Sequence, residues 1–199
     1  MLKQKFIKQI KALSFACEHL DENEVNNLFG ACIKTINGGG KIIVSALGKN
    51  VPICDKFSGT LTSLGIRANF LHTNSAVHGD LGLVEKNDLV ILISKSGNTS
   101  ETVYLSELLK KRGSHTWLIT CNSYAKSSNF VDKILLLNMK HEGDLWNLVP
   151  NNSTILFLMV LQGLAMEIAE KLSVKLDTFK ANHPGGNIGK LLENKLTKK

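Results

Sequence analysis

The sequence is poor in the residues that cross-link a chain or bend it sharply. Among its 199 residues there are 3 prolines and 4 cysteines, and 6% of the residues are aromatic. No two cysteines form a Cys-x-x-Cys pair and none has a histidine at metal-ligand spacing, so we expect reduced core cysteines instead of disulfides or a zinc site. The scarce prolines and the 16 glycines favour an α/β fold with many tight turns.

Long hydrophobic runs and an export signal are also missing. Hydrophobic residues make up 43% of the chain, but the longest apolar window, residues 155–169, is interrupted by Gln162, Gly163 and Glu167. The N-terminus carries lysines where a signal peptide would have an apolar core. We therefore expect a globular cytoplasmic protein without a membrane-spanning segment, long enough for one domain with its own core.

Basic residues outnumber acidic ones without forming a long block. The formal net charge is +7 and the pI is about 9.2. The basic residues gather near residues 3–11, 110–112 and 195–199, with few aromatic residues among them. Because nucleic-acid sites need a continuous basic surface or a recognisable binding motif, we favour solvated faces over a nucleic-acid partner. An anionic small molecule is compatible with this charge.

The glycine patterns that bind nucleotides are absent. Residues 45–49, at the end of the first predicted strand, do not match Gly-x-Gly-x-x-Gly, and no Gly-x-x-x-x-Gly-Lys-Ser/Thr sequence occurs. The run of glycines in residues 37–41 precedes a strand instead of following one. Dinucleotide-binding and P-loop functions are therefore disfavoured.

The most informative stretch is residues 90–102, Val-Ile-Leu-Ile-Ser-Lys-Ser-Gly-Asn-Thr-Ser-Glu-Thr. Its four apolar residues predict a strand buried on both faces of a parallel sheet. The hydroxyl-rich turn that follows leads into a helix, and the acidic Glu101 suits the first turn of that helix. Such a turn offers hydroxyls and free N–H groups to an anion such as phosphate, although an ordinary capped strand-to-helix loop would look the same.

Periodicity along the whole chain predicts alternating strands and helices. Strands are expected at residues 41–47, 67–71, 89–93, 116–120 and 133–137. Helices are expected at residues 2–20, 22–35, 52–64, 99–112, 153–172 and 174–181, with a last helix after the turn at 183–187. This order predicts a single α/β domain, a three-layer αβα sandwich with a doubly wound, five-stranded parallel sheet. Two N-terminal helices would occupy about residues 1–36 and a basic tail about residues 190–199.

Polar side chains follow several of the predicted strands. They include Lys49 after the first strand, His78 after the second, the loop at residues 94–99 after the third and Glu142 after the fifth. Because ligands bind at the carboxyl ends of strands in such sheets, we expect these groups to share one edge.

Two predicted helices have features of their own. Asp21 is expected to cap the second helix, and Asn152 or Ser153 the helix at 153–172. The latter helix is apolar nearly all round, so it is buried in the core or against a partner.

Five segments together resemble the sugar isomerase (SIS) domain family, specifically its arabinose-5-phosphate isomerase branch, over residues 1–193. They are Leu-Gly-Lys-Asn at 47–50, Ala-Val-His-Gly-Asp-Leu-Gly at 76–82, Ser-x-Ser-Gly-x-Thr-x-Glu at 94–101, His-Glu leading to Pro-Asn-Asn-Ser-Thr at 141–154, and Asn-His-Pro-Gly-Gly at 182–186. The last of these is distinctive within the family.

The resemblance implies a cofactor-independent and metal-independent aldose–ketose isomerase of phosphosugars. It implies interconversion of D-arabinose 5-phosphate and D-ribulose 5-phosphate through an enediolate. The implied phosphate-binding residues are Ser45, Ser94, Ser96, Gly97, Asn98 and Thr99, and the implied catalytic residues are Lys49, His78, Glu101, Glu142 and His183. These types suit the chemistry: histidine for ring opening, a carboxylate for proton transfer and a cation beside the enediolate.

Some positions depart from the family pattern or allow another interpretation. Ser45 stands near a usual glycine, Asn98 stands where glutamate is usual, and residues 143–150 differ from the usual Ala-Cys-Pro-Leu-Gly-Leu-Ala-Pro. Either Glu101 or Glu142 could be the base; we favour Glu142, because Glu101 also suits the start of a helix. Each of these residues taken alone could equally be a solvated or locally hydrogen-bonded side chain.

The sequence is also compatible with other functions. Another SIS isomerase would act on a hexulose or heptulose phosphate, and a phosphosugar-binding regulator would bind without catalysis. The resemblance further implies a homotetramer built as a dimer of dimers, in which His183 completes a neighbour's site. Relatives usually continue into two CBS domains beyond the point where this sequence ends, so regulation through such domains is not expected.

Overall fold

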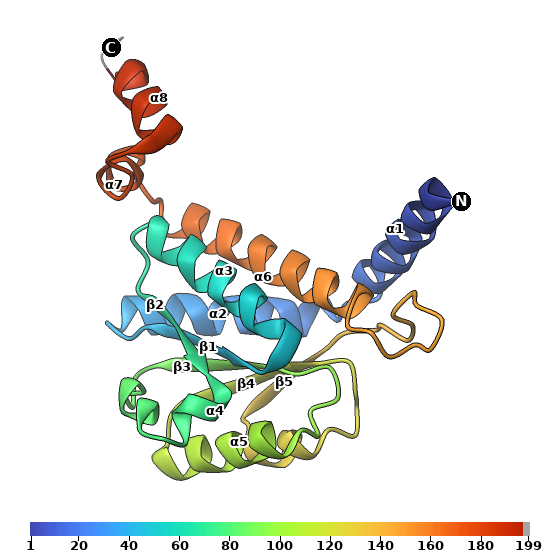
Figure 1. Cartoon of the computed structure of the whole chain (residues 1–199). Coiled ribbons are helices and arrows are strands. Elements are labelled where there is room, and N and C mark those ends of the chain that lie inside the picture. The colour runs from blue at the N-terminus through green and yellow to red at the C-terminus, as the bar shows by residue number, and fades with distance from the viewer. Residues whose placement is uncertain (197–199) are drawn as a thin grey trace.

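The computed structural model describes residues 1–196, with side chains described up to residue 192, as five strands surrounded by helices (Figure 1). The strands are β1 (Ile42–Ala46), β2 (Ala68–His72), β3 (Leu89–Ile93), β4 (His115–Thr120) and β5 (Lys133–Leu136). The α-helices are α1 (Leu2–Glu18), α2 (Glu22–Asn37), α3 (Val51–Ser63), α4 (Thr73–Ala76), α5 (Ser100–Arg112), α6 (Asn152–Lys171), α7 (Leu176–Ala181) and α8 (Gly186–Leu196). Three short 3₁₀ turns are η1 (Gly48–Asn50), η2 (Asp80–Leu83) and η3 (Lys126–Phe130).

The sheet is parallel throughout, in the order β2-β1-β3-β4-β5. Every residue of β1 and β3 is buried, as continuous apolar runs predict for strands covered on both faces. The chain moves from β1 outward to β2 and then crosses to β3 on the other side of β1. The five-stranded, doubly wound sheet expected from the sequence is confirmed, and the element ends differ by only a few residues.

Helices cover both faces of the sheet and create two cores. On one face the larger core packs Val44 and Ile91 against Phe57 of α3 and Phe157 of α6. On the opposite face a smaller core packs Ile43, Val90 and Leu92 against α5. Because alternate residues of each strand point to opposite faces, both faces of the sheet carry a core, and the fold is a three-layer αβα sandwich.

Helix ends follow local rules at some positions and not at others. The Asp21 carboxylate accepts the N–H groups of Asn23 and Glu24 at the start of α2, which confirms the predicted cap. At α5, Gly113 ends the helix with φ of 72°, a conformation that favours glycine. The predicted cap of α6 is wrong: Asn152 and Ser153 lie inside the helix, and the side chain at the preceding position makes no capping hydrogen bond. The carboxylate that caps the start of α6 comes from another segment of the chain.

Helix α6 has the length and apolarity of a membrane span, with 20 residues and a mean hydropathy of 1.5 over its most apolar window. The sequence-based view that no segment reaches this length was therefore too strict. However, α6 packs along α3, α2 and α1 and buries Leu156, Phe157 and Leu161 in the larger core. These contacts are those of a core helix.

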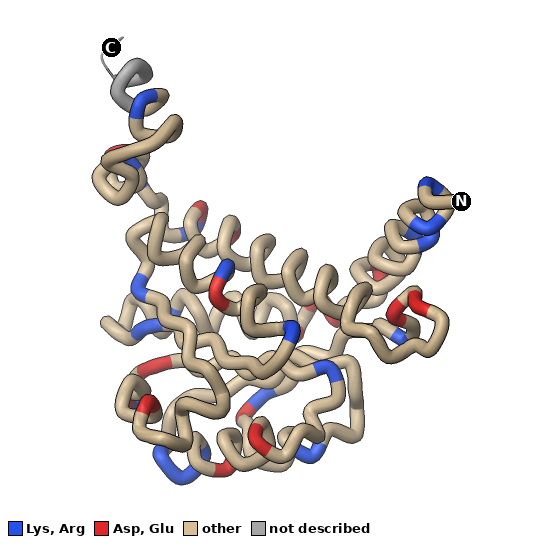
Figure 2. Tube along the Cα trace, in the orientation of Figure 1, with Lys and Arg blue, Asp and Glu red and all other residues tan. Residues whose placement is uncertain are grey.

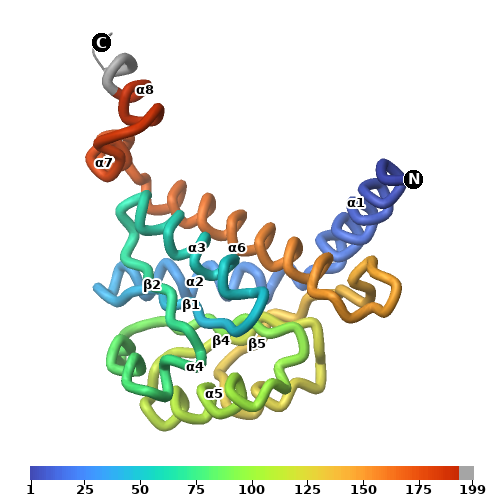
Figure 3. The backbone as a smooth tube through the Cα atoms, in the orientation of Figure 1, coloured from blue at the N-terminus to red at the C-terminus, as the bar shows by residue number. Residues whose placement is uncertain are grey.

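Helix α1 on one side and helices α7 and α8, in their described part, on the other project from the body of the domain (Figure 3). Only Leu13 and Ala16 of α1 are buried, whereas Phe6 and Ile10 are exposed. Lysine and arginine residues are spread over the described part of the chain and do not gather on one face (Figure 2). The last three residues of the expected basic tail, 197–199, lie outside the described residues.

Candidate functional site

Most of the predicted site residues follow strands at the carboxyl edge of the sheet. Lys49 follows β1, His78 follows β2, the loop at residues 94–99 follows β3, and Glu142 follows β5. Lys49 and the loop flank the point between β1 and β3 where the direction of winding reverses, which is the usual ligand position in such sheets. The side chains of Lys49 and His78 are exposed. The exceptions are Ser45 and His183.

The loop at residues 94–99 is held in a fixed shape by its own serines. The Ser94 hydroxyl accepts the N–H of Gly97 at 3.1 Å, and the Ser96 hydroxyl accepts the N–H of Asn98 at 3.2 Å. Gly97 has φ of 59°, and a Cβ there would collide with Ala125, so this position requires glycine. The loop therefore presents exposed polar groups, including Ser96, Asn98 and Thr99, on a rigid turn.

Neighbouring segments fix the same loop from behind. The Gly97 carbonyl accepts both the N–H and the hydroxyl of Ser127, and the Asn98 side-chain oxygen accepts the N–H of Lys126 at 2.8 Å. Thr99 precedes α5 in an extended conformation, but its hydroxyl makes no capping bond. The first N–H groups of α5 thus have no side-chain cap from Thr99, which leaves them available to an anion.

Ser45 lies outside this loop. The strand β1 continues through Ala46, so Ser45 is an interior strand residue and not part of the following turn. Its side chain is fully buried, and its hydroxyl is 2.9 Å from that of Thr73, also fully buried. The predicted phosphate contact from Ser45 has no exposed hydroxyl here.

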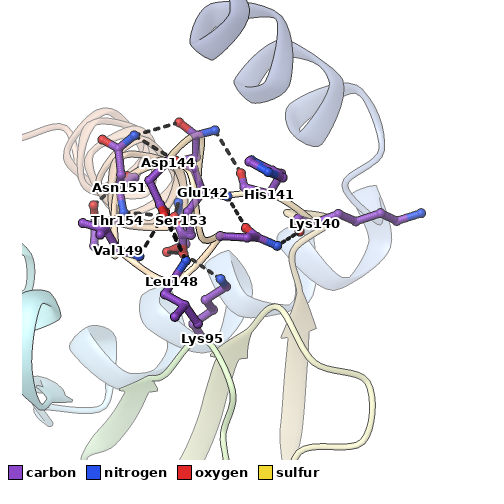
Figure 4. A network of polar contacts seen from close by, with 12 residues as sticks. Lys95, Lys140, His141, Glu142, Asp144, Leu148, Val149, Asn151, Ser153 and Thr154 are labelled. Carbon is purple, nitrogen blue, oxygen red and sulfur yellow. Dashed lines mark hydrogen bonds and ion pairs between the residues drawn. The ribbon is translucent and has the colours of Figure 1, made fainter. Parts of the chain in front are cut away.

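Glu142 is the most heavily contacted of the predicted residues (Figure 4). Its side chain is fully buried, and four donors reach its carboxylate: the Lys95 ammonium at 2.8 Å, the Ser153 hydroxyl at 2.6 Å, and the N–H groups of Ser153 and Asn151, both at 2.9 Å. The two N–H groups belong to the start of α6. Glu142 is thus the cap that α6 lacks in its own sequence.

The donors around Glu142 set its ionisation. Burial of the carboxylate raises its pKa, but the hydrogen bonds from Lys95, Ser153 and Asn151 together outweigh burial and hold the pKa below its usual value. Glu142 is therefore a firmly ionised carboxylate whose acceptor positions are all occupied, which makes it a weak base in this arrangement.

Lys95 was not singled out by sequence reasoning. It lies inside the hydroxyl-rich loop, and its side chain is 36% exposed while it pairs with the fully buried Glu142. Its carbonyl accepts the N–H of Cys121 and the hydroxyl of Thr120, which holds its backbone on β4. Nothing in the sequence around Lys95 indicates that its side chain forms an ion pair with a buried carboxylate far along the chain.

The other predicted carboxylate, Glu101, has a different setting. It is exposed in the first turn of α5, and the Ser100 hydroxyl donates to its carboxylate at 2.8 Å. This hydrogen bond, with one from its own backbone, lowers the pKa of Glu101. Among the described residues, no three or more His, Cys, Asp or Glu side chains form a group that could hold a metal ion.

His183 is separated from the other predicted catalytic residues. It follows α7, and its ring packs against that of Phe179 at a tilt of 35° and hydrogen-bonds to the Phe179 carbonyl. The neighbouring Asn182 contacts the carbonyl of Ser63 at the end of α3. Glu142 caps the start of α6 whereas His183 lies beyond its end, and a 20-residue helix is about 30 Å long. One chain alone does not bring these two residues together.

The segment after Glu142 forms an ordered apolar loop where the sequence departs from the family pattern. The Asp144 carboxylate accepts the N–H groups of Trp146, Leu148 and Val149. This arrangement leaves the Trp146 side chain 70% exposed, and Leu145 and Leu148 are exposed beside it. Leu145 shares a cavity with Phe6 of α1.

Comparison with known proteins gives consistent matches. The SIS domain family profile matches residues 36–167. Arabinose 5-phosphate isomerase KpsF of Escherichia coli is 33% identical over 191 residues, 96% of this chain and 58% of its own. Arabinose 5-phosphate isomerase KdsD of Pseudomonas aeruginosa is 32% identical over 162 residues, 81% of this chain and 50% of its own.

A solved structure agrees with the sequence matches. The structure of E. coli CFT073 c3406 in complex with arabinose 5-phosphate superimposes with a TM-score of 0.86 and 30% identity, covering 92% of this chain and 95% of that one. The chain thus spans nearly the whole of this solved domain but only 50–58% of the length of the curated relatives.

Proposed function

Because this chain belongs to the SIS domain family, we propose that it is an aldose–ketose isomerase that interconverts D-arabinose 5-phosphate and D-ribulose 5-phosphate. The observation that carries the proposal is the rigid, hydroxyl-rich loop at residues 94–99, which lies between Lys49 and Glu142 at the carboxyl edge of the sheet. The curated relatives with this activity and the neighbour solved with arabinose 5-phosphate support the choice of a pentose phosphate.

The proposed roles follow from where the side chains lie. The loop binds the phosphate through Ser94, Ser96 and Thr99 and through N–H groups at the start of α5. The exposed Lys49 lies at the same edge and stabilises the negative charge of the enediolate. His78, on the neighbouring loop, assists ring opening, because a histidine can exchange a proton near neutral pH. Neither a cofactor nor a metal takes part.

Glu142 is proposed as the base that moves the proton between adjacent carbons. Its position next to the phosphate loop, through the contact with Lys95, supports this role. Its four hydrogen bonds oppose it, because an occupied carboxylate cannot also accept a substrate proton. Glu101 is the alternative base, since its carboxylate is exposed just after the same loop. To act as the base, Glu142 must lose one of these hydrogen bonds, so that one of its carboxylate oxygens is free to accept the substrate proton.

The active unit is proposed to be an assembly in which His183 completes the site of another chain. The separation of His183 from Glu142 within one chain supports this arrangement. Exposed apolar side chains on α1, including Phe6 and Ile10, and on the loop at residues 143–149, including Trp146, offer surfaces for such contacts. A dimer of dimers would contain four such sites. A cytoplasmic location stays a prediction.

A substrate panel tests the proposed function. The purified chain is incubated with pentose, hexulose and heptulose phosphates, and the products are separated and identified. Turnover of D-ribulose 5-phosphate above all others is expected. Turnover of only a hexulose or heptulose phosphate would assign another isomerase activity. Stabilisation by a phosphosugar without turnover of any would assign a binding function instead.

A further inference from the structure

The contact between Lys95 and Glu142 connects the two halves of the proposed site (Figure 4). Lys95 lies in the loop that is proposed to bind the phosphate, between Ser94 and Ser96. Glu142 is the proposed base and lies after β5, on the far side of β4. Lys95 therefore belongs to the phosphate loop through its backbone and contacts the proposed base through its ammonium group.

The four donors to Glu142 differ in how freely they can leave. Oε2 accepts the N–H groups of Asn151 and Ser153, which are fixed because they belong to the first turn of α6. Oε1 accepts the Ser153 hydroxyl, which is buried on the same helix, and the Lys95 ammonium. Lys95 alone comes from a different segment, is 36% exposed and has a flexible four-carbon stem.

We propose that Lys95 is a positioning residue that holds Glu142 in the unliganded protein and moves to the phosphate when a phosphosugar enters the loop. The departure of the ammonium leaves one acceptor position of Oε1 free to take a proton from the substrate. Phosphate binding at one end of the substrate would thereby prepare the base at the other end. This inference rests on the proposed function and adds a coupling between its two parts.

Electrostatics favours the transfer in the stated direction. Near pH 7 a phosphate group carries more negative charge than a carboxylate, and below its second pKa of about 6 it keeps one negative charge and several acceptor oxygens. The ammonium would leave a carboxylate that keeps three other donors, so Glu142 stays hydrogen-bonded after the move. Loss of the nearby cation would raise the pKa of Glu142, because burial then acts against fewer compensating hydrogen bonds.

Among the described residues, Glu142 forms no ion pair besides the one with Lys95. Cys121, after β4, interacts with both Lys95 and Glu142, and burial raises the pKa of its thiol to about 12, so it stays neutral. On the segment of Glu142 itself, His141 and Asp144 line a cavity together with Lys5 and Lys8 of α1. None of these groups belongs to the phosphate loop.

The test follows the ionisation of Glu142 directly. Protein labelled with ¹³C at glutamate carboxyl carbons is titrated with acid, with and without saturating inorganic phosphate, and the Glu142 signal is identified by its loss in Glu142→Gln. In the wild type, phosphate should raise the pKa of Glu142. In Lys95→Met the pKa should already be raised, and phosphate should shift it much less. Lys95→Arg should restore most of the phosphate-dependent shift.

A matched control separates this coupling from a general effect of charge. Lys126 is an exposed lysine whose backbone N–H contacts Asn98 of the same loop, so Lys126→Met removes an equal charge nearby without touching Glu142. It should behave as the wild type does. Equal phosphate-induced shifts in the wild type and in Lys95→Met would overturn the proposal, as would bound phosphate that leaves the wild-type pKa unchanged. If Lys95→Met does not fold, the comparison is made with Lys95→Gln.

The result is independent of turnover. If phosphate shifts Glu142 through Lys95 but no phosphosugar is isomerised, the coupling stands and the proposed function fails. If the protein isomerises a phosphosugar but phosphate leaves Glu142 unchanged, the function stands and the coupling fails. As a kinetic counterpart, the acidic limb of the kcat/KM profile should move to higher pH in Lys95→Met and stay in place in Lys126→Met.

Discussion

Glu142 and Ser153 lie 11 positions apart in the sequence, and the Glu142 carboxylate accepts both the N–H and the hydroxyl of Ser153. The proposed base therefore also caps the central helix α6. Removal of its charge should destabilise the fold, because buried donors lose their acceptor. We expect Glu142→Gln to lower the free energy of unfolding by about 2–4 kcal/mol, measured by urea denaturation near pH 7. Glu101→Gln, at an exposed carboxylate, is the control and should change little.

The hydrogen bonds to the Glu142 carboxylate also predict how the stability of the fold depends on pH. The pKa of Glu142 is lower in the folded protein than its ordinary value of 4.5, so the ionised carboxylate stabilises the fold above about pH 4.5. This contribution is lost as the pH falls from that value through the lower folded pKa. The stability difference between wild type and Glu142→Gln should therefore shrink below about pH 4.5. A difference that stays constant down to acid unfolding would show that Glu142 has the same pKa in the folded and unfolded protein.

The proposed phosphate anchor is tested by removing two exposed hydroxyls. Ser96→Ala combined with Thr99→Ala should raise KM strongly, since hydrogen bonds to a charged group contribute about 1.5–3 kcal/mol each. Ser94 is left intact because its hydroxyl holds the loop through Gly97. Ser123→Ala, at an exposed serine next to Asn122, whose side chain contacts the Ser96 carbonyl, serves as the control. An unchanged KM in the double variant would mean that the phosphate binds elsewhere.

The two candidate bases are separated by matched substitutions. Glu142→Gln should lower kcat at least about a hundredfold, as expected for loss of general base catalysis. Because the same change weakens the cap of α6, activity is measured at a temperature where circular dichroism shows the variant to be folded. Glu101→Gln should retain more activity than Glu142→Gln. The reverse order in folded proteins would assign the proton transfer to Glu101.

Sequence patterns predicted the fold more completely than the site. The apolar runs of β1 and β3 identify buried strands by themselves, since both faces are covered. The cap of α6 was wrongly assigned because a local rule favours Asn152 or Ser153, whereas a distant carboxylate satisfies the helix start. The contact of Lys95 with Glu142 depends on strand order and on a flexible side chain, neither of which a linear pattern contains.

The role of His183 illustrates the same limit. The motif around it was recognised in the sequence, and the resemblance implied that it acts in another chain, but the packing of its ring against Phe179 and its place beyond the far end of α6 come from the structure. If His183 acts in another chain, mixing two inactive variants should restore activity. Lys49→Met and His183→Ala are dissociated, mixed and reassembled; Lys49 is chosen because its side chain is exposed. Random pairing should restore about a quarter of the wild-type activity. Confirmed mixed assemblies without activity would refute shared sites.

The isomerase activity itself is tested most directly by turnover of D-arabinose 5-phosphate in deuterated water, followed by NMR. An aldose–ketose isomerase that works through an enediolate should form D-ribulose 5-phosphate, and the product should carry deuterium at C1, because the base can exchange its proton with solvent before returning it. The wild-type chain is predicted to give this labelled ketose. If folded protein forms no ketose from this substrate, the proposed function is contradicted.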